Sequence, residues 1–348
     1  MKENNNNEIN TTIPKITILK DLANDSYAEN DSDNTFCAFK SIDDILLLFY
    51  TNKINSVISY NIITNQKVNE IKKAHEKIIT NLRHCLDKSN KRDLILSISD
   101  RDNNIKIWNA QNCNCLLSLT NIYSKGRIYS ACFLNDNSQI YILASSFDWR
   151  DDMIELIKVY DLNGNKIKEI EDSYENIFFI DSYYDNKLSK NFIVTGNEGC
   201  SKSYDYNNNK LYHKYYDSEQ PKYYSYANSI HSSIVINNYK NQTYLIESCH
   251  AGILWMWDFH SGLKIGIIEA SNSEDGISGI CLWDNDYLLV SSYYRIIVID
   301  IKNKKVIKGI KGHHNNIYTL KTIDHPQYGK CLISHGFDPC IKLWVKKN

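Results

Sequence analysis

Short runs in which apolar side chains alternate with polar ones recur along the whole chain. A related pattern also recurs, in which a run containing β-branched residues is followed by an aromatic residue and then Asp or Asn. Its best copies lie at 105–109 and 253–258, and the last copy, at 341–344, ends at the aromatic residue. Runs of roughly four to eight residues with a period of two predict half-buried β-strands. No amphipathic helical period competes with them over comparable lengths. The pattern therefore predicts an all-β chain.

The same pattern recurs at nearly constant spacing. Successive marker residues are separated by 42 to 53 positions, and they are Tyr60, Trp108, Tyr160, Tyr204, Trp257, Ile299 and Trp344. A period of about 40–45 residues with four strands in each unit is typical of propeller blades. In the last unit we predict strands at 317–322, 330–334 and 341–344, separated by polar or Gly-containing breaks. We therefore predict a seven-bladed β-propeller of four-stranded antiparallel blades.

The seventh unit lacks a fourth strand, because the chain stops at Asn348 soon after its third. A candidate for the missing strand lies at 15–19, ahead of the first full set of strands, which begins near Phe36. A ring closed by strands from both ends of the chain has no free sheet edge. We predict this closure, a single propeller domain over 13–348, and a disordered polar tail over 1–12.

Two of the units carry side chains that resemble the WD-repeat family. Blades of that family have Gly-His before the first strand, Ser or Thr on the second, Asp in the next turn and Trp on the third. The seventh unit has the whole set, Gly312, His313, Ser334, Asp338 and Trp344. The second unit has His75, Asp102 and Trp108, with Ser97 or Ser99 as the hydroxyl. The other five units depart from the pattern.

The resemblance implies that the top face of the propeller binds partners. In the family this face is built from residues that lead into the first strands and from the turns before the third strands. Carried over to this sequence, the partner-binding residues are Thr80, Arg101, Arg127, Tyr129, Trp149, Arg150, Phe178, Asn197, His250, Tyr294, Asn316, Tyr318 and Phe337. The set is rich in aromatic residues and Arg, as the cores of interfaces are. Trp149 beside Arg150, in a long acidic loop, is typical of an interaction hot spot.

Composition and charge argue against several classes of function. The formal charge of -1 gives no excess of basic residues for binding nucleic acid. The short Lys-rich segments at 302–305 and 346–347 are expected to be a solvent-exposed hairpin and a solvent-exposed terminus. No apolar run reaches the roughly 20 residues of a membrane helix, so we expect no membrane insertion. The ten cysteines are scattered. They predict reduced thiols and a cytoplasmic or, alternatively, nuclear location.

The residues that resemble a catalytic triad or a metal site are better explained as parts of the blade pattern. Ser334, His313 and Asp338 have the residue types of a catalytic triad, but their order and spacing are those of the blade network. Cys113 and Cys115 have no second pair at zinc spacing, and no phosphate-binding Gly-rich loop is present. We expect no catalytic residue, no metal and no cofactor.

The favoured function is a non-catalytic scaffold or adaptor that binds a protein or peptide within a larger complex. One alternative is a substrate receptor of a ubiquitin ligase. Some such receptors carry Trp-Asp-x-Arg after the third strand, whereas here Trp257-Asp258 is followed by Phe259-His260. The other alternative is a propeller enzyme with a site at the central channel. The first strands predicted at 277–283 and 317–322 supply few ionisable groups for it.

Overall fold

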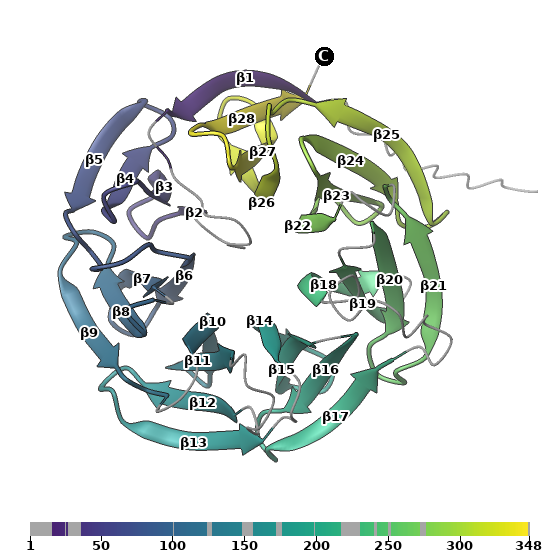
Figure 1. Cartoon of the computed structure of the whole chain (residues 1–348), viewed down its shortest axis with the longest axis horizontal. Helices are drawn as coiled ribbons and strands as arrows, with labels where there is room; N and C mark the ends of the chain where they lie inside the picture. The colour runs from purple at the N-terminus through teal and green to yellow at the C-terminus, as the bar shows by residue number, and fades with distance from the viewer. Residues whose placement is uncertain are drawn as a thin grey trace, which may run out of the picture.

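The strands form seven separate four-stranded sheets, each antiparallel, that stand as blades around a central axis (Figure 1). The computed structural model describes residues 16–24, 26, 36–99, 101–123, 127–147, 156–171, 176–197, 199–216, 230–239, 242–249, 252–271 and 276–346. Within these ranges every regular element is a strand, which confirms the predicted fold class. None of these residues forms a helix that is long and apolar enough to cross a membrane.

Each of the first six blades is a meander of four consecutive strands. Blade 1 contains β2 (Phe36–Lys40), β3 (Leu46–Thr51), β4 (Val57–Asn61) and β5 (Gln66–Ile71). Blade 2 contains β6 (Asn81–Asp87), β7 (Arg92–Ser99), β8 (Asn104–Asn109) and β9 (Cys115–Thr120). Blade 3 contains β10 (Arg127–Asp136), β11 (Gln139–Phe147), β12 (Leu156–Asp161) and β13 (Lys166–Glu171).

The remaining blades follow the same order. Blade 4 contains β14 (Ile177–Asp185), β15 (Lys190–Asn197), β16 (Cys200–Asp205) and β17 (Lys210–Tyr215). Blade 5 contains β18 (Ile230–Tyr239), β19 (Gln242–Cys249), β20 (Ile253–Asp258) and β21 (Lys264–Glu269). Blade 6 contains β22 (Ile277–Leu282), β23 (Tyr287–Ser292), β24 (Arg295–Asp300) and β25 (Lys305–Lys311). Blade 7 contains β26 (Ile317–His325), β27 (Gly329–Gly336), β28 (Ile341–Lys346) and β1 (Ile16–Ala23).

The hydrophobic core is divided into seven clusters, one between each pair of neighbouring blades. Between blades 6 and 7, for example, Leu289 and Val298 pack in one cluster with Leu332 and Trp344. A single sheet cannot bury both of its apolar faces alone, so each blade relies on two neighbours. This arrangement explains why the marker residues recur, since all seven lie on the third strands of their blades.

The ring closes in blade 7, where the first strand of the chain pairs with the last. β1 runs antiparallel to β28, with Ile16 opposite Lys346 and Ala23 opposite Ile341 (Figure 1). The predicted closure is confirmed, although the strand extends to Ala23 rather than ending at residue 19. Two register shifts let it follow β28 over this length. Residues 1–12, for which we predicted a disordered tail, lie outside the described residues.

A buried hydrogen-bond network joins the strands of blade 7. Nδ1 of His313 lies 3.2 Å from Oδ2 of Asp338, and its Nε2 lies 2.7 Å from Oγ of Ser334. The indole Nε1 of Trp344 donates to the same Ser334 oxygen at 2.7 Å. These groups tie the turn before β26, the strand β27 and the strand β28 into one unit.

Blade 2 repeats this network and settles which serine belongs to it. Nε2 of His75 and Nε1 of Trp108 both lie 2.8 Å from Oγ of Ser97. Nδ1 of His75 lies 3.2 Å from Oδ2 of Asp102. The hydroxyl is therefore that of Ser97. The buried Ser99 hydroxyl makes no hydrogen bond with His75 or Trp108.

Gly312 shows why the blade network needs glycine beside its histidine. A Cβ atom at this position would lie 1.8 Å from Cη2 of the buried Trp344 ring. We expect Gly312→Ala to lower the free energy of unfolding by about 1–3 kcal/mol, because the ring must move away from the added methyl group. Denaturant unfolding measures this change.

Gly309→Ala is the matched control for that substitution. Its Cβ would meet the tip of the Ile297 side chain at 3.2 Å, a close contact from which this flexible end can move away, and Cδ of Arg295 at 3.7 Å, an ordinary contact. We expect little loss of stability there. If both variants unfold at the same denaturant concentration, the contact between Gly312 and Trp344 does not limit stability.

Candidate functional site

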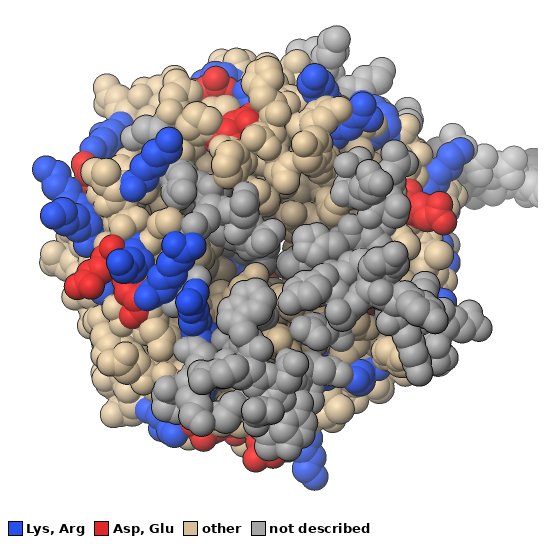
Figure 2. All heavy atoms as spheres, in the orientation of Figure 1, with Lys and Arg blue, Asp and Glu red and all other residues tan. Residues whose placement is uncertain are grey.

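The top face consists of the turns between second and third strands together with the segments that lead into the first strands. Strand direction alternates within each blade, so these segments from all seven blades lie at the same end of the propeller. Figure 2 views the molecule from this end and shows Lys and Arg side chains, with some Asp and Glu among them, over blades 1 and 2 at the left. The residues predicted to bind partners fall on this end, but they differ widely in exposure.

The predicted residues separate into four groups. Three are exposed, namely Arg101, Arg127 and Phe337. Four are partly buried, namely Thr80, Tyr129, Tyr294 and Asn316. Three are buried, so their side chains are not part of the exposed surface, namely Phe178, Asn197 and Tyr318. The last three, Trp149, Arg150 and His250, lie outside the described residues.

Backbone hydrogen bonds bring several of the predicted positions together at the junction of blades 6 and 7. The Ile317 amide donates to the carbonyl of Tyr293 at 2.8 Å, and the Phe337 amide donates to the carbonyl of Asn316 at 2.8 Å. The turn after β23, the start of β26 and the turn after β27 are thereby linked. We call Tyr293, Tyr294 and Phe337 the blade 6–7 patch.

Two side chains of the blade 6–7 patch are exposed to solvent, and the third, Tyr294, is partly buried beside two cations. Tyr293 is 48% exposed and Phe337 is 47% exposed. The Tyr294 ring lies 5.1 Å from Tyr293, measured between ring centroids. The guanidinium of Arg295 and the ammonium of Lys311 lie 5.5 Å and 5.1 Å from the centroid of Tyr294. The patch combines apolar area with positive charge.

Tyr293 was not among the residues predicted from the sequence. Its φ angle of 53° places it in the left-handed region, which is uncommon for a bulky aromatic residue. Such a backbone conformation occurs in two-residue hairpin turns and at functional sites. Two adjacent tyrosines in a tight turn were the only sequence signal, and it did not show which of them the turn exposes.

A second group of predicted residues lies at β-bulges in the first strands. The pairing with the second strand shifts between Ile128 and Ser130 in blade 3, and between Ile177 and Phe179 in blade 4. Tyr129 and Phe178 are the extra residues at these shifts, and their rings meet edge to face with centroids 5.8 Å apart. Bulges change the direction of a side chain, which explains how residues from two blades come into contact.

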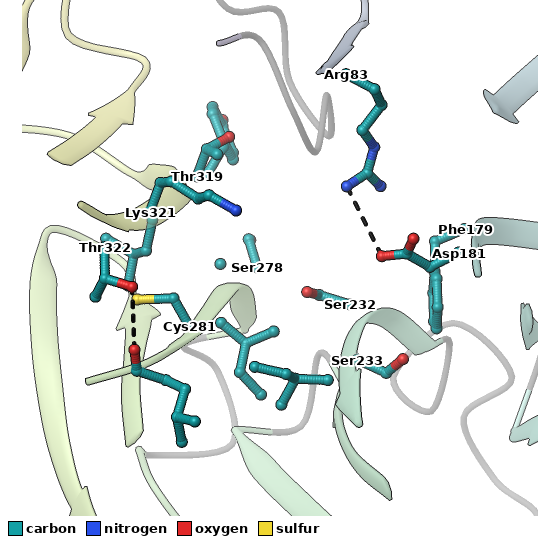
Figure 3. A pocket seen from close by; sticks show the side chains of 16 residues that line it. Arg83, Phe179, Asp181, Ser232, Ser233, Ser278, Cys281, Thr319, Lys321 and Thr322 are labelled. Atoms are coloured by element: carbon teal, nitrogen blue, oxygen red, sulfur yellow. Dashed lines mark hydrogen bonds and ion pairs between the residues drawn. The ribbon is translucent and has the colours of Figure 1, made fainter. Parts of the chain in front are cut away.

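The central channel contains two adjoining cavities, of about 320 and 520 Å³. The first strands of all seven blades contribute to their walls, and the two cavities share Arg83, Asp181 and Lys321. Figure 3 shows these three residues in the smaller cavity. NH1 of Arg83 lies 3.9 Å from Oδ2 of Asp181. The sequence did not single out these three residues. Among the described residues that line the cavities there are one carboxylate, Asp181, and one imidazole, His84.

Ser334, His313 and Asp338 have the hydrogen-bond order of a catalytic triad, but they lie inside the blade. Burial lowers the pKa of His313 to about 4, so its imidazole is neutral near pH 7. A carboxylate only accepts hydrogen bonds, so Nδ1–H donates to Asp338 and Nε2 accepts from the Ser334 hydroxyl. Ser334 is 0% exposed and its oxygen already accepts from Trp344, which leaves no room for a substrate.

The same imidazole lies near a cysteine, which raises the question of a metal site. One ligand atom from each of His313, Asp338 and Cys340 lies within 4.8 Å of the others. Both ring nitrogens of His313 are already hydrogen-bonded, and burial raises the pKa of the Cys340 thiol. A metal ion would need a free nitrogen and a thiolate. The residues present therefore fit the blade network better than a metal.

Blade 5 replaces the network serine with a carboxylic acid. The indole Nε1 of Trp257 donates to Oε1 of Glu247 at 2.8 Å, as Trp344 donates to Ser334. Oε2 of Glu247 is buried without a hydrogen-bond partner among the described residues. Burial raises the pKa of Glu247 to about 7, although the nearby Ser201 hydroxyl and Trp257 indole act in the opposite direction. The blade thus holds a buried acid that titrates near neutral pH.

The motif considered for a ubiquitin-ligase receptor also has a structural role here. His260 occupies the place of the motif's Arg, and its Nε2 lies 3.1 Å from Oδ2 of Asp185 in blade 4. Phe259, the preceding residue, is fully buried. The segment after β20 therefore connects blades 4 and 5.

Comparisons with known proteins add no family assignment. No protein-family model matches the sequence, and a search of curated proteins finds no match either. The seven-bladed propeller accordingly stands on the strand topology itself.

Proposed function

We propose that this chain is a WD-repeat propeller that acts as a non-catalytic scaffold and binds a protein or peptide on its top face, as part of a larger complex. The hydrogen-bonded sets in blades 2 and 7 support the family assignment, because blade 7 has the family's whole pattern and blade 2 has all of it except the glycine, which is Ala74 here. The blade 6–7 patch is the observation that carries the binding function.

Three properties of the blade 6–7 patch favour a macromolecular partner. Its aromatic side chains present apolar area on a rigid scaffold, and loops on rigid scaffolds commonly carry binding. Tyr and Arg are the residue types enriched at interface hot spots. Arg295 and Lys311 add positive charge beside Tyr294. A partner segment that combines apolar and acidic side chains would complement this surface.

The alternatives find less support in the same observations. An enzyme site at the channel would gather several acids or imidazoles, whereas the described lining residues include only Asp181 and His84. The triad-like residues are buried in blade 7. A ubiquitin-ligase receptor of the type considered would need an Arg where this chain has His260.

The double variant Tyr293→Asn and Phe337→Ser tests the binding proposal. Asn tolerates the left-handed backbone at residue 293, so the turn should persist while the aromatic area is lost. We expect the recovery of at least one partner in quantitative affinity purification from the protein's own cells to fall about tenfold or more.

Leu263→Ser is the matched control for this variant. Leu263 is 68% exposed in the turn between β20 and β21, at the opposite end of the propeller. It should leave recovery unchanged. Equal partner recovery with the wild type and the double variant would exclude the blade 6–7 patch as the binding surface.

A further inference from the structure

The central channel carries charged side chains that the proposed scaffold function does not use. Arg83 extends from β6, Asp181 from β14 and Lys321 from β26, and all three line both cavities. Figure 3 shows them around the smaller one. They come from blades 2, 4 and 7 and meet only because the ring places the first strands around one axis. Two cations face one carboxylate, so the group has one positive charge in excess.

Arg83 is held in the channel with its hydrogen-bonding capacity largely unused. Its 3.9 Å separation from Asp181 is too long for a hydrogen bond. Its Nε is buried and has no hydrogen-bond partner within the described chain. A guanidinium offers five N–H donors, and leaving buried donors unpaired is unfavourable. The structure therefore presents a donor group that an incoming acceptor would satisfy.

Lys321 adds a second cation that no described carboxylate neutralises within ion-pair distance. Figure 3 shows its ammonium pointing into the cavity, on the wall opposite Asp181. Both Lys321 and Arg83 lower the pKa of the Cys37 thiol, while burial, the larger influence, raises that pKa to about 12. Cys37 therefore stays neutral and does not offset the positive charge. The two cations act on the same part of the channel.

The channel also has the size and the neutral donors that a small ligand needs. Cavities of about 320 and 520 Å³ fall within the range of small-molecule sites, roughly 300–1,000 Å³. Ser232 and Ser278 line the smaller cavity with hydroxyl groups (Figure 3). Asp181 accepts a hydrogen bond from the Ser182 amide at 2.8 Å, which fixes the carboxylate beside the guanidinium.

We propose that the central channel binds a small oxyanion, of the phosphate or the carboxylate class, between the Arg83 guanidinium and the Lys321 ammonium. The planar guanidinium matches the paired oxygens of either class, and the ammonium supplies a second charge. Asp181 positions the guanidinium and limits the affinity by like-charge repulsion. This site is separate from the top-face surface proposed for a macromolecular partner.

Isothermal titration of the full chain with inorganic phosphate, and separately with succinate, tests this proposal. We expect binding that weakens about tenfold in Lys321→Gln and strengthens at least about threefold in Asp181→Asn. These two variants remove one charge each and change affinity in opposite directions, so a general loss of folding cannot produce both results. Lys305→Gln on the outer strand β25 is the matched control and should bind as the wild type does.

The two titrations also distinguish the source of the oxyanion. Binding of phosphate alone assigns the site to phosphate compounds, binding of succinate alone assigns it to carboxylates, and binding of both supports the shared chemistry. If neither anion binds, or if Lys321→Gln and Lys305→Gln bind equally well, the channel is not an oxyanion site.

Discussion

Removal of residues 1–23 should destabilise the propeller by at least about 4 kcal/mol. The truncation deletes β1, which buries Ile16, Leu22 and Ala23 and pairs along the whole length of β28. Burial of one Ile or Leu side chain contributes about 1.5–3 kcal/mol, and the outer edge of β28 would be exposed as well. Whole domains are stable by only about 5–15 kcal/mol, so this loss is a large share of the total. Denaturant unfolding of the truncated chain measures it.

A shorter deletion separates closure of the ring from a simple effect of chain length. Removal of residues 1–12 leaves β1 intact and should not shift the unfolding midpoint. If the chain without residues 1–23 does not fold at all, the double variant Ile16→Ala and Leu22→Ala probes the same contacts. We expect it to lose about 4 kcal/mol or more. Unchanged unfolding in both the long truncation and the double variant would show that β1 does not close the ring.

Glu247→Gln should make stability less dependent on pH, with a gain over the wild type that grows as the pH rises. The wild-type carboxyl has a pKa of about 7 in the folded protein against 4.5 for the free group. Between these values the folded state holds a proton that the unfolded chain has released, so wild-type stability falls as the pH increases. Above about pH 7 the carboxyl is ionised in both states, and burial of its charge then lowers the free energy of unfolding by about 3 kcal/mol.

The measurement compares unfolding free energies of the two proteins from about pH 4.5 to 8. Some groups make stability rise with pH instead, such as the buried His313, whose pKa is lowered to about 4. These groups are present in both proteins, so their contributions cancel in the difference. Gln keeps an acceptor for the Trp257 indole, so the network should survive. Glu269→Gln, at an exposed position on β21, should show no such trend. A difference that stays constant with pH would mean that Glu247 is ionised over the whole range.

The features that the sequence predicted are those set by local periodicity. Alternation around Trp108 and Trp344 indicates a strand whatever surrounds it, and the repeat spacing then fixes the number of blades. The closure could be predicted because the seventh unit lacked its fourth strand, while an additional strand was predicted at 15–19, ahead of the first unit. Each of these inferences depends on residues close together in the chain or on a simple count.

The features that the sequence did not predict depend on contacts between distant residues. Arg83, Asp181 and Lys321 belong to three blades, and their meeting follows from how each first strand is turned toward the axis. The bulge at Tyr129 changes the direction of that side chain. It results from the pairing of β10 with β11, which the local sequence pattern does not indicate. Glu247 stands where the family pattern has Ser or Thr, and only its hydrogen bond with Trp257, formed between two strands, reveals its role in the network.

The pairing of Ile16 with Lys346 has a further consequence for how the protein is made. These partners lie 330 positions apart, so the ring cannot close until β28 has left the ribosome. Until then the clusters that blade 7 shares with blades 1 and 6 are incomplete, and their apolar side chains stay uncovered. Closure of the ring therefore waits for β28 while apolar surface is exposed, which favours aggregation, and β1 must stay unpaired until β28 arrives.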